Sequence, residues 1–133
     1  VSQQHDCTSL AEDNTNRILV FDNRYVPNDF APSAFSRVVE YDLTESAPCV
    51  FLPQISGPKI RWVYVDGVCD FFSAYISGAQ RLKGFTLEEH GVQYTLITEG
   101  MKGRIFLVKT TIGRENESVV LQNKVIWEFM NPE

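Results

Sequence analysis

The chain has 133 residues, 44% hydrophobic and 22% charged, which excludes an intrinsically disordered protein and fits one globular domain over residues 1–133. Its formal net charge of −5 argues against a dedicated nucleic-acid binder, because such proteins usually carry an excess of positive charge. No apolar run approaches the roughly 20 residues that a membrane-spanning helix needs, so we expect no membrane span.

The predicted elements are mainly β-strands that follow an N-terminal arm. Residues 1–16 are polar, and we expect them to form a flexible arm. Branched and aromatic residues then recur in short stretches separated by Pro, Gly, Asn and Asp, a pattern typical of strands joined by turns. Residue 117 begins a long stretch with one apolar face, which favours an antiparallel sheet packed on a core. The expected strands are 17–21, 35–41, 48–54, 59–65, 91–98, 104–111 and 117–129.

One segment, 69–82, has helical spacing instead of alternation. Its apolar positions Phe71, Tyr75, Gly78 and Leu82 fall at i, i+4, i+7 and i+11, so we expect one short helix there. Ala74 and Gly78 lie one turn apart and would give this helix a flank of small side chains, where another backbone could approach closely. Together these elements predict a small antiparallel β-barrel or sandwich of six to seven strands with one short helix.

No signature of catalysis is present in the sequence. It contains no GxSxG, HExxH, P-loop or GxGxxG motif. The possible bases are His5, in the expected arm, and His90, in an expected turn, while the adjacent Glu88 and Glu89 would point to opposite faces of a strand. The cysteines and histidines match no zinc spacing. We therefore expect a non-enzymatic protein with no catalytic residue, no metal and no cofactor.

The three cysteines bear on the compartment. An odd number without CxxC spacing favours reduced thiols in an intracellular protein. The alternative is a secreted interaction domain, which a disulfide at Cys7 would support.

A binding signal lies in residues 59–64, where Lys59 and Arg61 alternate with apolar and aromatic residues that include Trp62 and Tyr64. Proteins that bind single strands combine cations with rings in this way, and stacking contributes about 1–3 kcal/mol per base. Ile60, Trp62 and Tyr64 would share one face of the strand. The alternative interpretation is an ordinary strand with both large rings in the core and Arg61 in solvent.

An ordered set of short motifs extends this signal: Val38-Val39-Glu40 with Asp42, Pro48-Cys49-Val50-Phe51, Gly57-Pro58-Lys59-Ile60-Arg61-Trp62-Val63-Tyr64, then Ala74 and Gly78. In this order, residues 38–82, about a third of the chain, resemble non-structural protein nine, the single-stranded RNA-binding replicase subunit of nidoviruses, best known from coronaviruses. The resemblance implies a seven-stranded barrel whose C-terminal helix packs against a second copy. The family ends just after that helix, whereas about fifty residues follow Leu82 here.

The function implied by this resemblance is that of a non-enzymatic viral replicase accessory subunit. It would bind single-stranded RNA weakly and without sequence preference, form a homodimer, contact other replicase subunits and reside in the host cytoplasm at replication complexes. Ala74 and Gly78 would form the dimer interface. The residues expected to bind RNA are Lys59, Arg61, Trp62, Tyr64, Arg81 and Lys83.

A lipocalin-like or NTF2-like barrel that binds a small apolar ligand is the alternative function. The many aromatic residues and the long terminal strand suit it equally well. A closed cavity lined by aromatic residues would favour this alternative, and an exposed basic groove would favour RNA.

Overall fold

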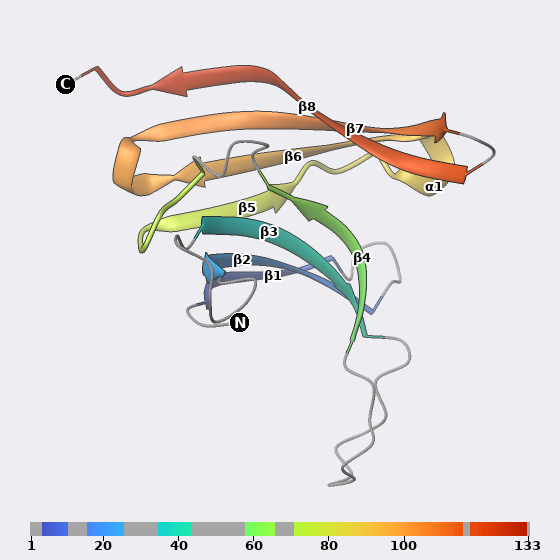
Figure 1. Ribbon diagram of the computed structural model, residues 1–133, viewed down its shortest axis with the longest axis horizontal. Helices are drawn as coiled ribbons and strands as arrows, with labels where there is room; N and C mark the ends of the chain where they lie inside the picture. Colours follow the sequence, from blue (N-terminus) through green and yellow to red (C-terminus); the bar gives the residue numbers. More distant parts are fainter. Residues whose placement is uncertain are drawn as a thin grey trace, which may run out of the picture.

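A computed structural model describes residues 4–10, 16–25, 35–43, 58–65, 71–115 and 118–132. The chain forms two four-stranded antiparallel sheets and one short helix, which confirms the predicted mainly β class (Figure 1). The described residues contain eight strands, more than the six or seven expected, and they form no closed barrel. None of the described helices has the length and apolar character needed to cross a bilayer.

Each sheet is built from strands that are consecutive in the chain. The first has the order β1-β2-β3-β4 and the second β5-β6-β7-β8, as expected where short connections join antiparallel neighbours. The helix α1 (Leu87–His90) connects β5 to β6. The strands are β1 (Gln4–Ser9), β2 (Arg17–Tyr25), β3 (Phe35–Asp42), β4 (Lys59–Tyr64), β5 (Ser77–Arg81), β6 (Val92–Glu99), β7 (Arg104–Glu115) and β8 (Ser118–Met130).

A cluster of aromatic rings between the sheets forms the centre of the core. Phe21 of β2, Tyr64 of β4, Phe71 and Phe106 of β7 lie with ring centroids 5.4–5.7 Å apart. Edge-to-face pairs of this kind contribute about 0.5–1.5 kcal/mol each beyond the area they bury. On β6 every second residue is buried, which is the pattern of a strand with one face on a core.

Side chains, and not ladder hydrogen bonds, connect the edges of the two sheets. Between β1 and β5, the Ala79 amide donates to the Asp6 carboxylate at 3.2 Å and the Thr8 hydroxyl donates to the Ala79 carbonyl at 3.4 Å. Between β4 and β8, the Trp62 indole donates to Asn123 Oδ1 at 2.9 Å, and Asn123 Nδ2 donates to the Val63 carbonyl at 3.0 Å. These two seams explain why the sheets lie close together without closing a barrel.

The helix predicted over 69–82 is wrong. Its C-terminal part forms β5, whose ladder with β6 runs from Ser77 opposite Glu99 to Arg81 opposite Thr95. Residues 71–76 are irregular, and Ile76 has φ +54°, a left-handed conformation that interrupts a helix. Phe71 is buried in the core, whereas Tyr75 is half exposed, so the apparent helical stripe does not share one face.

The observed helix lies a few residues further along the chain. Thr86 caps it by accepting a hydrogen bond from the Glu89 amide, and Gly91 ends it at φ 65°. The N-terminal stretch also differs from the expectation of a flexible arm, because Gln4–Ser9 pairs with β2. The strand expected at 48–54 lies outside the described residues.

A candidate ligand-binding groove

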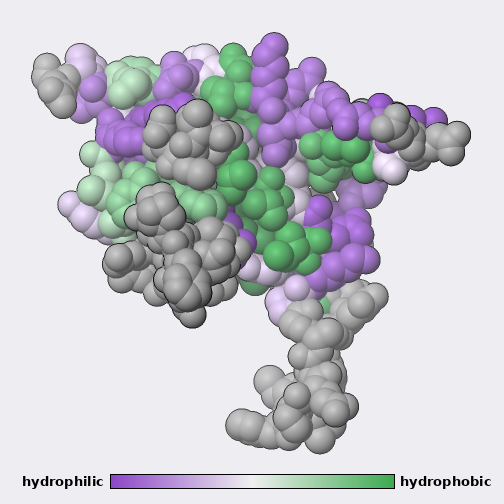
Figure 2. All heavy atoms as spheres, in the orientation of Figure 1, coloured by the Kyte–Doolittle hydropathy of each residue, from purple (hydrophilic) through white to green (hydrophobic). Residues whose placement is uncertain are grey.

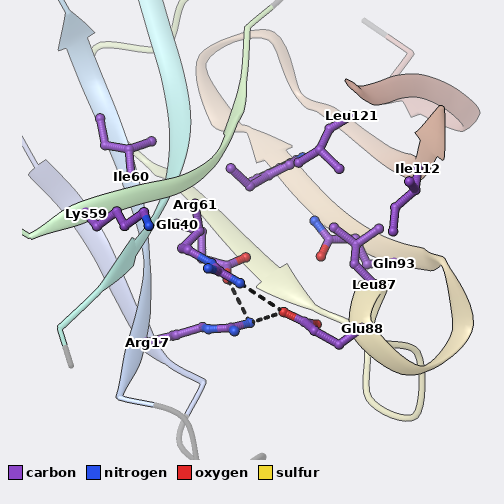
Figure 3. A pocket seen from close by; sticks show the side chains of 11 residues that line it. Arg17, Glu40, Lys59, Ile60, Arg61, Leu87, Glu88, Gln93, Ile112 and Leu121 are labelled. Carbon is purple, nitrogen blue, oxygen red and sulfur yellow. Dashed lines mark hydrogen bonds and ion pairs between the residues drawn. The ribbon is translucent and has the colours of Figure 1, made fainter. Parts of the chain in front are cut away.

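Three hollows share lining residues and are together called the groove; the first is a cleft of about 310 Å³ bounded by β4, α1 and side chains of β6, β7 and β8 (Figure 3). A small hollow shares Arg17, Glu40, Glu88 and Gln93 with this cleft. A third hollow of about 270 Å³ shares Leu10, Arg81, Phe85 and Thr86 with the small one. The hollows are open to solvent, so the groove is not the closed cavity that the apolar-ligand alternative requires.

The groove concentrates positive charge on an acidic chain. Among the described residues that line it, five are cationic, against the two carboxylates of Glu40 and Glu88. A cleft lined mainly by one sign of charge focuses the electric field and attracts ligands of the opposite sign. The cationic residues are Arg17, Lys59, Arg61, Arg81 and Lys83.

Ion pairs hold three of these cations in place. Glu88 of α1 accepts from Arg17 at 2.8 Å and from Arg61 at 3.4 Å, as Figure 3 shows. Glu40 of β3 accepts from Arg81 at 2.6 Å and from Arg17 at 3.5 Å. Glu40 is buried and Glu88 is half exposed. The network therefore joins both sheets and the helix at the floor of the groove.

These contacts shift the pKa values of Arg17 and Glu88. Burial opposes the charged form of Arg17, but the hydrogen bond to Glu88 and the charges of Glu88, Glu40 and Asp42 outweigh it and raise the pKa above its ordinary value. Burial likewise tends to raise the pKa of Glu88. A backbone hydrogen bond and the arginines at positions 17 and 61 outweigh that effect, so this pKa lies below its ordinary value of 4.5. Both groups are therefore charged at neutral pH.

The structure brings most of the sequence-predicted RNA-binding residues together. Lys59 and Arg61 line the first cleft, while Arg81 and Lys83 line the third hollow. The Arg81 guanidinium lies over the Trp62 ring, 4.8 Å from the ring centroid. The predicted cations thus share one groove, although β4 and β5 belong to different sheets.

The two predicted rings belong to the core. Trp62 is 3% exposed and Tyr64 is 5% exposed. The Trp62 indole donates hydrogen bonds to Thr110 and Asn123, and Tyr64 packs on Phe71. Stacking on a base requires an exposed ring face, and neither ring meets this requirement.

Phe85 is an exposed ring of the groove that the sequence interpretation missed. It is half exposed and lines both the small hollow and the third hollow. Its ring packs edge-on against that of Tyr94, with 5.2 Å between the ring centroids. Arg17 was missed as well, because its place in the groove depends on how β2 lies beside α1. A sequence signal exists for Phe85: it directly precedes Thr86, the residue that caps α1.

The two residues predicted for dimerisation do not share a helix flank. Ala74 lies in the irregular segment, where its amide donates to Met101 Sδ at 3.1 Å. Gly78 lies on β5 at the seam with β1, and a Cβ at this position would lie 2.7 Å from Asp6 Oδ2. Gly78 therefore allows the close approach of β1 within one chain. The helical interface has no counterpart among the residues that the structure describes.

Hydrophobic side chains gather in the middle of one face of the molecule, and hydrophilic and hydrophobic side chains are mixed along the edge where β8 runs (Figure 2). The described part of the chain holds no cluster of three or more potential metal ligands. The Cys7 thiol is exposed and forms no disulfide among the described residues, which do not include Cys49 or Cys69.

No protein-family model, curated protein or solved structure matches this chain.

Proposed function

We propose that this protein is a non-enzymatic binding module that holds single-stranded RNA in the groove, weakly and without sequence preference. The observation that carries the proposal is the convergence of five cationic side chains on the adjoining hollows of one groove in an acidic chain. In this proposal the two sheets act as the halves of a small sandwich whose open end receives the strand. A role in a viral replicase rests on the resemblance of residues 38–82 alone.

The groove favours phosphates over other parts of the ligand. Guanidinium and ammonium groups are strong donors to phosphate oxygens, and their charges release counterions from the strand. Contacts of this kind carry no base preference. Glu88 competes with phosphate for Arg17 and Arg61, so binding is expected to be weak.

Removing two cations of the first cleft tests this proposal. In the double variant Lys59→Gln and Arg61→Gln, we expect affinity for labelled single-stranded RNA to fall several-fold, measured by fluorescence anisotropy. The plot of log affinity against log salt has a negative slope, and this slope should become less steep by about 0.7 for each lost phosphate contact. Arg114→Gln, which neutralises an exposed arginine outside the groove, is the control and should leave affinity unchanged. Equal affinities for the double variant and the wild type would refute the groove as the RNA site.

Removing the competing carboxylate should have the opposite effect. In Glu88→Gln, the two arginines lose their charged partner and become available to phosphate, so affinity for RNA should rise several-fold in the same assay. Glu89→Gln is the matched control, because Glu89 is the next residue of the same helix and its side chain is 74% exposed. A rise in both variants would indicate only a general effect of net charge.

The same variant has a defined pH dependence. Because the pKa of Glu88 is lowered in the folded state, its ion pairs stabilise the fold above pH 4.5, and this contribution is lost as the pH falls through the folded-state pKa. Glu88 is half exposed, so the contribution is at most about 1 kcal/mol. Urea unfolding of wild type and Glu88→Gln should differ at pH 7 and converge in acid.

A second candidate function is the binding of a small ligand in the first cleft. It is favoured by Gln93, which is 5% exposed and whose Nε2 has no hydrogen-bond partner among the described residues. The cleft wall beside it is apolar, formed by Ile112 and Leu121. A short alkyl or aryl carboxylate that displaces labelled RNA in the anisotropy assay would support this candidate.

A further inference from the structure

The outer face of the second sheet presents an apolar surface that the core does not use. Alternate residues of β6 and β7 are buried between the sheets, including Ile97, Phe106 and Val108, so their neighbours in sequence face outward. Antiparallel partners share a face. The register therefore gives two outward rows, Leu96–Leu107–Trp127 and Thr98–Ile105–Phe129.

Two aromatic rings in these rows are open to solvent. Trp127 is 51% exposed and Phe129 is 47% exposed, and both lie on β8. Residues two apart on a strand are separated by about 7 Å, so each ring has room for a planar group of its own. Large exposed apolar groups gathered on one surface mark a binding site more often than they occur by chance.

A pair of lysines lies in the next row of the same face. Lys109 of β7 is directly opposite Lys124 of β8, and Tyr94 of β6 completes the row. Like charges directly opposite each other destabilise a sheet. Neither lysine has an ion-pair partner among the residues that the structure describes. An anion bound between them would relieve this repulsion.

We propose that this outer face is a second contact surface for single-stranded RNA, separate from the groove. Trp127 and Phe129 stack on bases, while Lys109 and Lys124 neutralise phosphates. The choice of RNA as the anionic partner rests on the proposed function, but the site and its residues do not. Flat rings beside cations on an open sheet are the combination with which single-strand binders hold successive bases.

A second copy of the chain fits this face less well. If two outer faces packed together around a two-fold axis, four lysines would converge on one interface. Charge complementarity therefore favours an anionic partner. Among anionic partners, a single-stranded nucleic acid also uses the exposed rings, because every base offers a planar face to them.

The contrast between the two tryptophans gives a direct measurement. Trp62 is buried in the core, whereas Trp127 is half exposed on the proposed surface. Titration with an oligouridylate RNA should quench the fluorescence of Trp127, since stacking brings a base against its indole. Quenching should fall sharply in Trp127→Phe, which keeps a ring but removes this fluorophore. Quenching as strong in that variant as in the wild type would show that Trp62, which lines the first cleft, reports the binding, and would overturn the proposal.

The affinity of ring-deletion variants completes the test. Trp127→Ala should bind the same RNA about five-fold to 150-fold more weakly, the range expected for one lost stacking contact. Val119→Ala removes part of another exposed apolar side chain of β8, in the row of Arg114, and should bind as the wild type does. Wild-type affinity in Trp127→Ala would refute the proposal.

The groove variants separate this proposal from the proposed function. If the groove fails as the RNA site, Lys59→Gln with Arg61→Gln binds normally while Trp127→Ala is still weakened. If the outer face fails, the double variant is weakened and Trp127→Ala is not. Quenching of Trp127 by anionic lipid vesicles but not by RNA would overturn the proposal in favour of a membrane surface. A dimer that is lost in Trp127→Ala without any RNA binding would overturn it in favour of a second copy.

Discussion

Replacing Glu40 with glutamine is expected to destabilise the fold by about 3–5 kcal/mol. Glu40 is 4% exposed on β3, and its carboxylate accepts from Arg81 at 2.6 Å and from Arg17 at 3.5 Å. The side chain of Arg81 is itself only 10% exposed. Glutamine keeps the size of the side chain but removes its charge, so the buried guanidinium loses the carboxylate that compensates it. The cost comes mainly from removing a charged partner of a guanidinium that stays buried, and less from the lost hydrogen bond.

Urea unfolding of wild type and variant measures this effect. A double variant, Glu40→Leu with Arg81→Leu, removes both charges and should recover most of the lost stability, because well-packed apolar residues often replace a buried ion pair at little cost. A loss below about 1 kcal/mol in Glu40→Gln would show that the pair is solvated in solution, as exposed ion pairs are.

Replacing Gly100 with alanine is the second change with a large expected effect, a loss of about 3 kcal/mol or more. A Cβ at Gly100 would lie 1.6 Å from the carbonyl oxygen of Ile76. That oxygen belongs to the backbone, so a whole segment has to move to make room, and overpacking of this kind is at the costly end of its range. Ile76 has φ +54° and is already strained, which leaves it little freedom to adjust.

A matched control for this change is Gly113→Ala on β7. The added Cβ would meet the side-chain amide of Gln122 at 2.7 Å, and that end of an exposed, flexible side chain can move aside. We expect a change within about 0.5 kcal/mol, as for most surface substitutions. Similar thermal stabilities for the two alanine variants would show that the chain at position 76 yields easily.

Alternation was a reliable guide to where the strands lie, but not to which face of a strand is buried. The pattern in residues 91–98 predicts the bounds of β6, and the pattern after residue 117 predicts the place of β8. The expected apolar face of β8 does not pack on the core as a whole, because Trp127 and Phe129 are about half exposed. The segment around Gly78 failed because four apolar residues at helical spacing do not reveal a partner strand. The β6 ladder and the positive φ of Ile76 decide the conformation there. The polar β1 carries no apolar signal, since it is held by backbone pairing with β2.

The candidate groove shows a similar limit. A period of two establishes that Trp62 and Tyr64 share a face, but it does not tell which face of the strand is buried. The cations of β4 and β5 were found from local charge, whereas Arg17 and Phe85 become neighbours of that charge only after the sheets and α1 pack together. A site assembled from four or more elements is therefore only partly visible in local sequence.

The seam between β4 and β8 allows the two sheets to shift slightly relative to each other at the groove. Within the described part of the chain, the hydrogen bonds across this seam come from one indole and one amide side chain, those of Trp62 and Asn123. The sheets can therefore part along this edge without breaking a ladder hydrogen bond in either of them. A large parting would also uncover Trp62 and Tyr64, which are buried at this edge, so only small displacements of the two sheets come at a low cost. A small adjustment of this kind depends on the seam between the two sheets, and not on the residues that line the groove.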